Sequence, residues 1–422
     1  MIETLRNAWK IPELRKKLMF TALVLLLYRI GNVIPVPYIN VDALSSYFNN
    51  FLGETILGLY NAMSGSAFSS GTVLALSIQP YINASIIIQL LTVAIPALER
   101  MAKEEGEEGK KKINMITRIA TVVLGLIMGW SFYMLLSSSS GILTKTGFLP
   151  GLVIVLTFTA GSAVVMWLGE QINEFGIGNG ISMILFANII SSLPRGLNTM
   201  LGMGWWAILV AVVMLALVLF IIFVNDAERR IPIQYAKRVV GRKIYGGQST
   251  NLPIKVSMSG VMPVIFAQSI CSFPATICAL FGINSQSGKW WFDTFFSSTS
   301  ITYAVCYFCM IFFFSWFYAA IQYDAVEISN NLKKNGGFIP GFRPGRPTAD
   351  FIQKVINKIV VFGAMYLGVV ALLPVICGII APSATGLSIG GTSVIIVIGV
   401  ALETVKAIEA QMLMRHYKGF LD

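Results

Sequence analysis

The stretch GETILGLYNAMSGSAFSSGTVLALSIQPYINASIIIQLLTVAIP, residues 53–96, decides how the chain folds. Its first part is rich in glycine and serine, which gives weak helix propensity and little side-chain volume. Its second part is apolar and long enough to cross a bilayer, yet it carries Gln79, Asn83 and Gln89. Lipid cannot satisfy such a polar stripe, which must therefore face protein or water. The stretch predicts a movable segment leading into a spanning helix beside a passage.

The composition of the whole chain agrees with a membrane protein. Its 422 residues are 55% hydrophobic and only 12% charged, which excludes a soluble class. Residues 1–17 are polar and basic and lead directly into an apolar run, so no cleavable signal peptide is expected. The five cysteines lie in or beside apolar runs. We interpret them as small buried hydrophobes and expect no metal or redox site.

Ten apolar runs are predicted to span the membrane. They lie at about residues 18–36, 73–95, 115–137, 151–170, 181–194, 205–225, 257–281, 303–323, 357–377 and 387–411. The fifth run is short. Because spans alternate in direction, a crossing is still required there to place Arg229 and Arg230 on the same side as the basic N-terminus. Of 31 lysines and arginines, 27 lie on one predicted side, and only Lys145, Arg195 and Lys289 lie in loops on the other. The positive-inside rule then predicts that both termini are cytoplasmic.

Ten spans with a long loop after the sixth suggest two groups of five. Because five is odd, the second group enters the membrane with the opposite orientation, as in an inverted repeat. We therefore predict an all-α polytopic membrane protein with ten transmembrane helices in two pseudo-symmetric inverted halves, residues 1–195 and 196–422. Spans 2 and 7 are the predicted partners across the pseudo-twofold axis.

The predicted spans contain very few ionisable side chains. Arg29, Glu403 and Lys406 are their clear ionisable residues, all within reach of helix ends, and His416 is the only histidine. No nucleotide-binding, metalloprotease or catalytic-triad motif occurs, so we expect no enzyme and no cofactor. A secondary transporter for a small solute remains the alternative, supported only by ten spans and inverted parity. The motifs GIGNG at 176–180 and GxxxG at 125–129 predict a tight turn and close helix packing.

Two basic loops, residues 226–256 and 324–358, are longer than loops that only fix the orientation of the neighbouring spans. They mix strand-like IPIQYA and turn residues with clustered positive charge. The loops predict docking of a large cytosolic partner, either an acidic protein or the phosphate backbone of RNA. The basic residues are Arg229, Arg230, Lys237, Arg238, Arg242, Lys243, Lys333, Lys334, Arg343 and Arg346.

Five motifs in order resemble the SecY family, the channel-forming subunits of the bacterial Sec protein translocase. They are PYINASIIIQLLT (80–92), GIGNGIS (176–182), ERRIPIQYAKR (228–238), GGFIPGFRPG (336–345) and GGTS (390–393). The resemblance implies an hourglass pore between the halves that passes unfolded preproteins and releases membrane segments sideways into lipid. The implied pore ring consists of Ile82, Ile86, Leu185, Ile189, Ile265 and Ile396. The pairs 82/86 and 185/189 are spaced by four residues, so each pair shares a helix face.

The same resemblance implies a lateral gate, a plug and a set of partners. The implied gate residues are Asn83, Ile87, Gln268 and Phe273, with Asn83 as a polar latch. A plug at about residues 56–70 would contain Ile56, Leu57, Tyr60, Met63, Ser64, Gly65 and Phe68. The implied partners are the small subunits SecE and SecG, the motor ATPase SecA, the ribosome, signal sequences, nascent polypeptides and lipid. The implied location is the bacterial plasma membrane.

Overall fold

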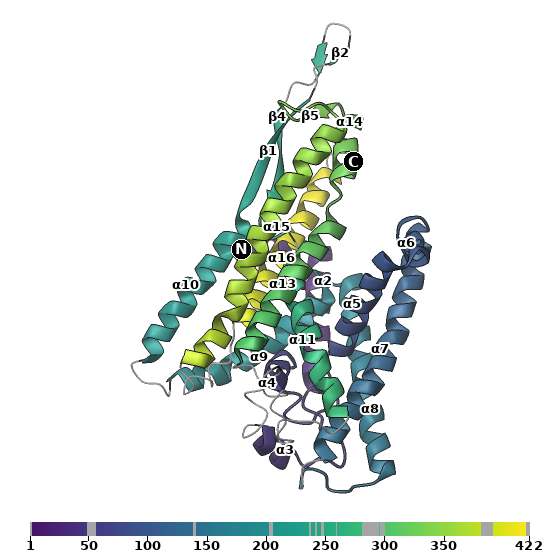
Figure 1. Cartoon of the computed structure of the whole chain (residues 1–422), viewed down its shortest axis with the longest axis vertical. Coiled ribbons are helices and arrows are strands. Elements are labelled where there is room, and N and C mark those ends of the chain that lie inside the picture. Colours follow the sequence, from purple (N-terminus) through teal and green to yellow (C-terminus); the bar gives the residue numbers. More distant parts are fainter. Residues whose placement is uncertain are drawn as a thin grey trace.

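The computed structural model describes residues 2–48, 56–137, 141–201, 206–235, 238–240, 243–245, 249–258, 260–280, 295, 300–380 and 391–418. Each of the ten predicted apolar runs falls on a helix (Figure 1). These helices are α2 (Pro12–Gly31), α5 (Gln79–Ala94), α7 (Gly106–Ser137), α8 (Phe148–Phe175), α9 (Gly180–Leu201), α10 (Trp206–Asp226), α11 (Met262–Leu280), α13 (Ile301–Gln322), α15 (Arg346–Ile380) and α16 (Gly391–Lys418).

Shorter elements connect these helices. The short helices are α1 (Ile2–Lys10), α3 (Val41–Tyr47), α4 (Ile56–Met63), α6 (Pro96–Lys103) and α14 (Ala325–Lys334). The strands are β1 (Glu228–Tyr235), β2 (Arg238–Val240), β3 (Lys243–Tyr245), β4 (Ser249–Lys255) and β5 (Gly337–Phe338). Among the described residues, four helices are individually long and apolar enough to cross a membrane, and the bent pair α5–α6 makes a fifth. Shorter apolar helices lie within α9, α10 and α11.

The second span is shorter than its apolar run. Residues 73–78 form turns, and Ser77 has a positive φ of 49°. The helix starts at Gln79 with Pro80 in its first turn, where a missing N–H costs nothing and a fixed φ favours the start. Pro96 ends the helix, and α6 leaves at 105° to α5. The apolar run therefore crosses as a turn-rich lead-in followed by a 16-residue helix.

Small residues bring α7 and α8 close together, as the GxxxG spacing predicts. A Cβ added to Gly125 would lie 3.0 Å from Ser162 Oγ, and one added to Gly129 would lie 3.3 Å from the Val155 carbonyl oxygen. Small side chains let helix backbones approach and gain van der Waals contact. The prediction of close packing at this motif is confirmed.

The first and second groups of helices meet along two seams. On one side α11 packs against α5 and α7, and on the other side α9 packs against α16 and α10. A large buried cluster joins residues of both groups between these seams. The predicted boundary at residues 195 and 196 lies inside α9, just after Pro194, so the position of the division stays a prediction.

The two basic loops together form one small sheet. The predicted all-α class did not include this sheet. The strand order is β4-β1-β5, with β1 antiparallel to both neighbours, and Gln234 pairs with Phe338. Residues about a hundred positions apart thus build one tower above the helices (Figure 1). Ile231, Ile254 and Ile339 anchor this sheet to α14 and α15 through a buried cluster. The strand-like character of IPIQYA is confirmed.

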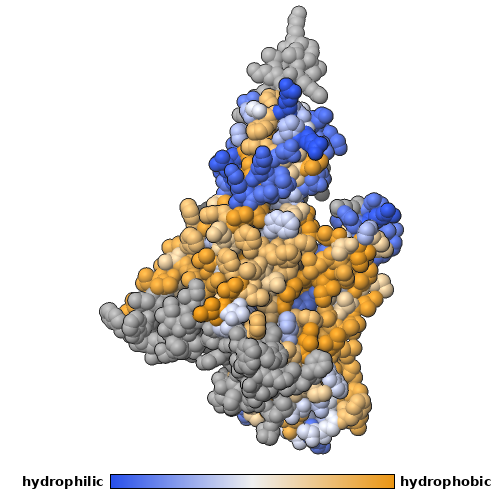
Figure 2. Space-filling model, in the orientation of Figure 1, coloured by the Kyte–Doolittle hydropathy of each residue, from blue (hydrophilic) through white to orange (hydrophobic). Residues whose placement is uncertain are grey.

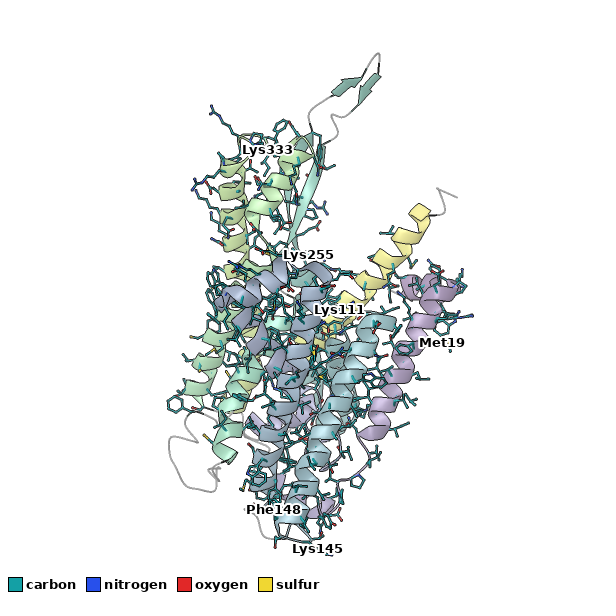
Figure 3. All side chains as sticks on the ribbon, turned by 90° about the vertical axis from the view of Figure 1, so that its right-hand side faces the viewer. Met19, Lys111, Lys145, Phe148, Lys255 and Lys333 are labelled. Carbon is teal, nitrogen blue, oxygen red and sulfur yellow. The ribbon has the colours of Figure 1, made fainter. Side chains whose placement is uncertain are left out.

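The surface divides into an apolar band and polar ends. Figure 2 shows a hydrophilic tower and a second hydrophilic lobe, where the α6–α7 turn lies in Figure 1, beyond a broad hydrophobic belt. Lys333 lies at the tower end, and Lys145 and Phe148 lie at the opposite end (Figure 3). On α10, Phe223 is 75% exposed. Such exposure of large apolar side chains is typical of a lipid-facing surface.

An apolar constriction and its closing elements as the candidate functional site

The six predicted ring residues come from four helices and meet in one buried cluster. Helices α5 and α9 each supply two residues, and α11 and α16 supply one each. All six are at most 2% exposed. Their convergence follows from local geometry, because residues four apart share a helix face, and from the two seams that bring the helices together. The members are Ile82, Ile86, Leu185, Ile189, Ile265 and Ile396.

The predicted plug is a short helix followed by a self-capped turn. Helix α4 ends at Met63, which belongs to the same buried cluster as the ring. Ser64 Oγ accepts a hydrogen bond from the Phe68 backbone N–H at 3.3 Å, and Asn61 Oδ1 accepts one from Ser69 N–H at 2.9 Å. These local bonds give the turn its own shape without a long helix. The side chains of Ile56 and Leu57 lie outside the described residues.

Aromatic side chains pack the plug segment against α7. The Phe68 ring centroid lies 4.1 Å from that of Phe132 and 5.0 Å from that of Tyr60. The Tyr60 hydroxyl donates to the Leu76 carbonyl oxygen at 3.0 Å, so its polar end is satisfied inside an apolar cluster. A small cavity beside these rings reaches Thr276 on α11. The segment therefore contacts the ring cluster through Met63 and also contacts α11.

Two polar contacts cross the seam between α5 and the second group. Gln79 Nε2 donates to Ser269 Oγ on α11 at 3.0 Å. Gln89, three turns further along α5, lies near the hydroxyl of Tyr318 on α13. Both glutamines belong to the polar stripe seen in the sequence, but neither was assigned to the gate. Their partners, a serine and a tyrosine in apolar runs, carry no local signal that could have identified them.

The predicted gate residues take different positions. Asn83 is buried, and its Nδ2 donates to Met128 Sδ on α7 at 3.8 Å, so this contact stays within the first group of helices. Ile87 is 39% exposed and Phe273 is half-buried. Gln268 is buried, with no partner for its Oε1 among the described residues. The Asn83 contact therefore stays on the α7 side and does not cross the seam, whereas the Gln79 contact does. The latch role of Asn83 stays a prediction.

The predicted docking residues lie on the tower. Those with described side chains are all exposed, and they are Arg229, Arg230, Lys333, Lys334, Arg343 and Arg346. Arg230 Nε donates to Glu228 Oε1 at 2.7 Å, a pair at the surface that leaves most of the charge available. Lys237 and Arg242 lie outside the described residues, as do the side chains of Arg238 and Lys243, which stand in β2 and β3.

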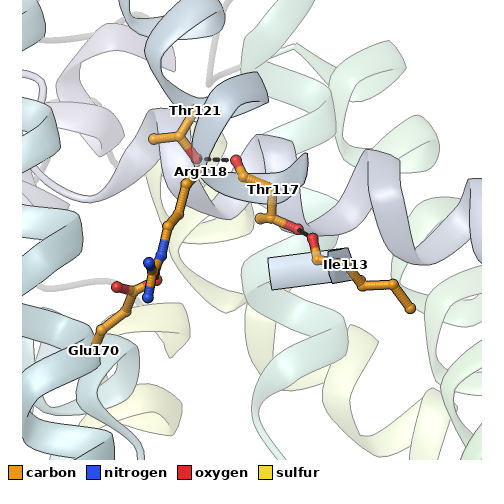
Figure 4. Close-up of polar contacts among 5 residues, drawn as sticks. All are labelled: Ile113, Thr117, Arg118, Thr121 and Glu170. Atoms are coloured by element: carbon orange, nitrogen blue, oxygen red, sulfur yellow. Dashed lines mark hydrogen bonds and ion pairs between the residues drawn. The ribbon is translucent and has the colours of Figure 1, made fainter. Parts of the chain in front are cut away.

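One charged pair within the helices was not predicted. Arg118 Nε on α7 donates to Glu170 Oε1 on α8 at 2.9 Å (Figure 4). Beside it, Thr121 Oγ1 donates to the Thr117 carbonyl oxygen at 2.7 Å, which satisfies that hydroxyl within α7. Pairing lowers the cost of placing either charge among apolar helices. Arg118 lies in the predicted run 115–137 and Glu170 at the end of the run 151–170, but neither was among the ionisable residues named for the spans.

At the polar end, Lys112 Nζ donates to Glu105 Oε2 at 2.7 Å, and this hydrogen bond raises the pKa of the Lys112 ammonium. No group of three or more His, Cys, Asp or Glu suited to a metal ion occurs in the described part of the chain. The assembled features define a class of protein. It is a multi-pass helical membrane protein whose two groups of helices close on an apolar constriction.

Residues 72–405 match the SecY family. The chain belongs to this family. It is 41% identical over 438 residues to the protein translocase subunit SecY of Streptomyces scabiei, covering 100% of both chains. Its fold is similar to a solved structure described as "The structure of a protein conducting channel", with a TM-score of 0.68 at 18% identity over 97% of each chain.

Two further solved structures share the fold. One is described as showing that the plug domain of the SecY protein stabilises the closed state of the translocation channel and maintains a membrane seal. This chain matches it with a TM-score of 0.66 at 19% identity over 97% of each chain. The other is Sec61 in a canine ribosome-channel complex, with a TM-score of 0.64 at 17% identity over 97% of each chain. The chain is thus a protein-translocation channel subunit.

Proposed function

We propose that the six ring residues form the constriction through which unfolded polypeptides pass. The observation that carries this proposal is their convergence, from four helices of both groups, in one fully buried apolar cluster. A narrow aliphatic constriction excludes water and ions by dewetting. Its side chains also offer no hydrogen bonds that would retain a particular sequence in transit.

Residues 56–70 are proposed as the plug that seals one side of the constriction. The contact of Met63 with the ring cluster supports this, as does the fold shared with a channel whose plug is reported to maintain a membrane seal. The small side chains and the self-capped turn let the segment leave its seat as a unit. Its own hydrogen bonds can stay intact on displacement, so the cost lies in its contacts with the surrounding helices.

The seam between α5, α7 and α11 is proposed as the lateral gate. A signal segment with ten leucine-like residues gains roughly 3–6 kcal/mol on entering lipid. The hydrogen bond of Gln79 across the seam contributes about 1 kcal/mol. This gain exceeds the contribution of the polar contact, so the contact by itself does not hold the seam closed against an arriving signal segment.

The basic tower is proposed as the docking site of the motor ATPase SecA or the ribosome, on the cytoplasmic side of the bacterial plasma membrane. The exposed arginines and lysines of two joined loops support this, and so does the uneven distribution of positive charge. The channel itself would do no chemistry. Small membrane subunits of the SecE and SecG type are the proposed partners in the membrane.

A photocrosslinker at Ile86 tests the constriction. A secretory chain stalled in transit is expected to crosslink at this position, because the Ile86 side chain lies in the ring. The matched control is Val93, which lies two turns further along α5 and is 54% exposed. Crosslinking at Val93 but not at Ile86 would show that the polypeptide follows another path.

A further inference from the structure

The proposed plug is tied to two helices by polar contacts that its packing does not require. Asn188 on α9 is fully buried, and its Nδ2 donates to the Met63 carbonyl oxygen at 2.8 Å and to Ser77 Oγ at 3.2 Å. Ser77 Oγ lies 3.0 Å from the hydroxyl of Tyr28 on α2, which is also fully buried. A continuous hydrogen-bonded path therefore runs from α2 through the lead-in turn of α5 to α9 and the end of the plug helix.

The turn after Met63 fits the same place only without a side chain. Gly65 has a φ of +66°, and a Cβ there would lie 2.9 Å from Arg29 Nη1, 3.0 Å from Ser191 Oγ and 3.1 Å from Asn188 Oδ1. The left-handed backbone disfavours a side chain here, and a Cβ would have to displace the Arg29 guanidinium and crowd Ser191 and Asn188. The seat of the plug is thus shaped around glycine at position 65.

We propose that Asn188, Ser77, Tyr28 and Gly65 form a polar latch that holds the plug closed and sets the threshold for opening. The inference rests on the proposed plug role of residues 56–70. The bond from Asn188 to Met63 exists only while the plug is seated. In an open channel both groups can reach water, so the bond shifts the equilibrium toward the closed state.

The position of Asn188 couples this latch to the constriction. It directly precedes the ring residue Ile189 on α9. A movement of α9 that widens the ring also moves the Asn188 amide, because the helix backbone is stiff between adjacent residues. Widening the constriction therefore weakens the hold on the plug, and a seated plug resists widening.

The test measures ion leak through the full-length chain, purified with its membrane partners and reconstituted in planar bilayers. Asn188→Leu keeps the branched shape and the number of heavy atoms but removes the amide, and it is expected to raise the leak about five- to tenfold, as the loss of the buried hydrogen bond to Met63 implies. Tyr28→Phe is expected to give a smaller increase. The control Ser192→Ala removes a hydroxyl that bonds only to its own helix at Ile189 O, and it should leave the leak unchanged.

Gly65→Ala tests the seat independently. It should raise the leak at least as much as Asn188→Leu, whereas Gly106→Ala should have no effect. Gly106 has a similar φ of +58°, but nothing lies within 4 Å of an added Cβ. Thermal unfolding of every variant shows whether the fold is retained. A folded Gly65→Ala or Asn188→Leu protein with wild-type leak would overturn the latch.

Deleting residues 60–68 separates failure of the latch from failure of the proposed plug. If the deletion leaks while both latch variants remain tight, residues 60–68 seal the channel but the latch does not hold them. If the deletion itself stays tight, the plug role fails and the latch fails with it.

Discussion

Gln79 and Asn83 lie four residues apart on α5, yet their amides have different partners. Gln79 bonds across the seam to Ser269, and Asn83 bonds to Met128 within its own group of helices. The first contact must break when the seam opens, whereas the second can persist. Only the first can therefore bias the gate directly, and the two residues differ in function despite their spacing.

Replacing Gln79 by Leu removes one bond that stabilises the closed gate. About 1 kcal/mol less stability for the closed state corresponds to a roughly fivefold shift toward opening. The expected result is increased export of a substrate with a defective signal sequence, measured as the processed fraction in cells. Thr92→Val is the control, because Thr92 Oγ1 bonds to the Ile88 carbonyl oxygen of its own helix. Equal export by both variants would refute a role for Gln79 in gating.

Gly161 on α8 lies so close to a neighbouring backbone segment that only glycine fits there. A Cβ at this position would overlap the Val73 carbonyl oxygen of the lead-in turn. Gly161→Ala is expected to lower stability by about 1–3 kcal/mol, the usual cost of overpacking. Thermal unfolding in detergent measures this, with Gly169→Ala on the same helix as the control, since its nearest contact is at 3.4 Å. Equal melting temperatures would contradict the predicted overlap.

At the scale of elements, the sheet β4-β1-β5 makes one platform from two distant loops. Alternate residues of β1 face the cluster below and the solvent above, with Ile231 and Ile233 buried and Gln234 exposed. The positive residues need this platform to present a common surface. Docking should therefore depend on buried residues of the tower as well as on its charges.

Ile231→Asp tests this dependence. A carboxylate among Ile254, Ile339 and Ile352 would be buried without a partner, so the sheet is expected to lose its seat on the helices. Binding of ribosomes or of the motor to membranes containing the variant should fall more than tenfold, measured by co-sedimentation. Gln234→Asp introduces the same charge on the exposed face, and a loss of similar size there would point to charge alone.

At the scale of the whole molecule, two seams join the helix groups, and only one carries the proposed gate. The seam of α5, α7 and α11 contains the Gln79 bond, whereas α9 meets α16 and α10 on the other side. The chain itself crosses from the first group to the second through α9 and α10. This connection makes the second side the natural hinge.

A crosslink across the first seam is expected to stop transport. In a variant without its five native cysteines, the pair Gln79→Cys and Ser269→Cys should block export on oxidation and restore it on reduction. The control pair Gly125→Cys and Ser162→Cys joins α7 to α8 within one group, where the Cβ and Oγ positions lie 3.0 Å apart. Export that continues with the first pair oxidised would show that the seam need not open.

Periodicity and hydropathy predicted much of this arrangement. The ten helices and the shared faces of Ile82 with Ile86 and of Leu185 with Ile189 follow from spacing along single helices. The membership of Ile265 and Ile396 in the ring came from family resemblance, and the structure places both in the cluster. Helix ends were less predictable, because proline chemistry at Pro80 and Pro96 shortened α5 within a uniformly apolar run.

The sequence by itself determined the membrane class, the ten spans, the distribution of charge and the polar stripe of α5. Only the tertiary structure decided which polar groups meet: Gln79 with Ser269, Arg118 with Glu170, and Asn188 with Met63. The physical reason is that hydropathy and helical period are properties of one segment. A hydrogen bond between segments depends on the rotation and depth of two helices at once, and their packing sets both.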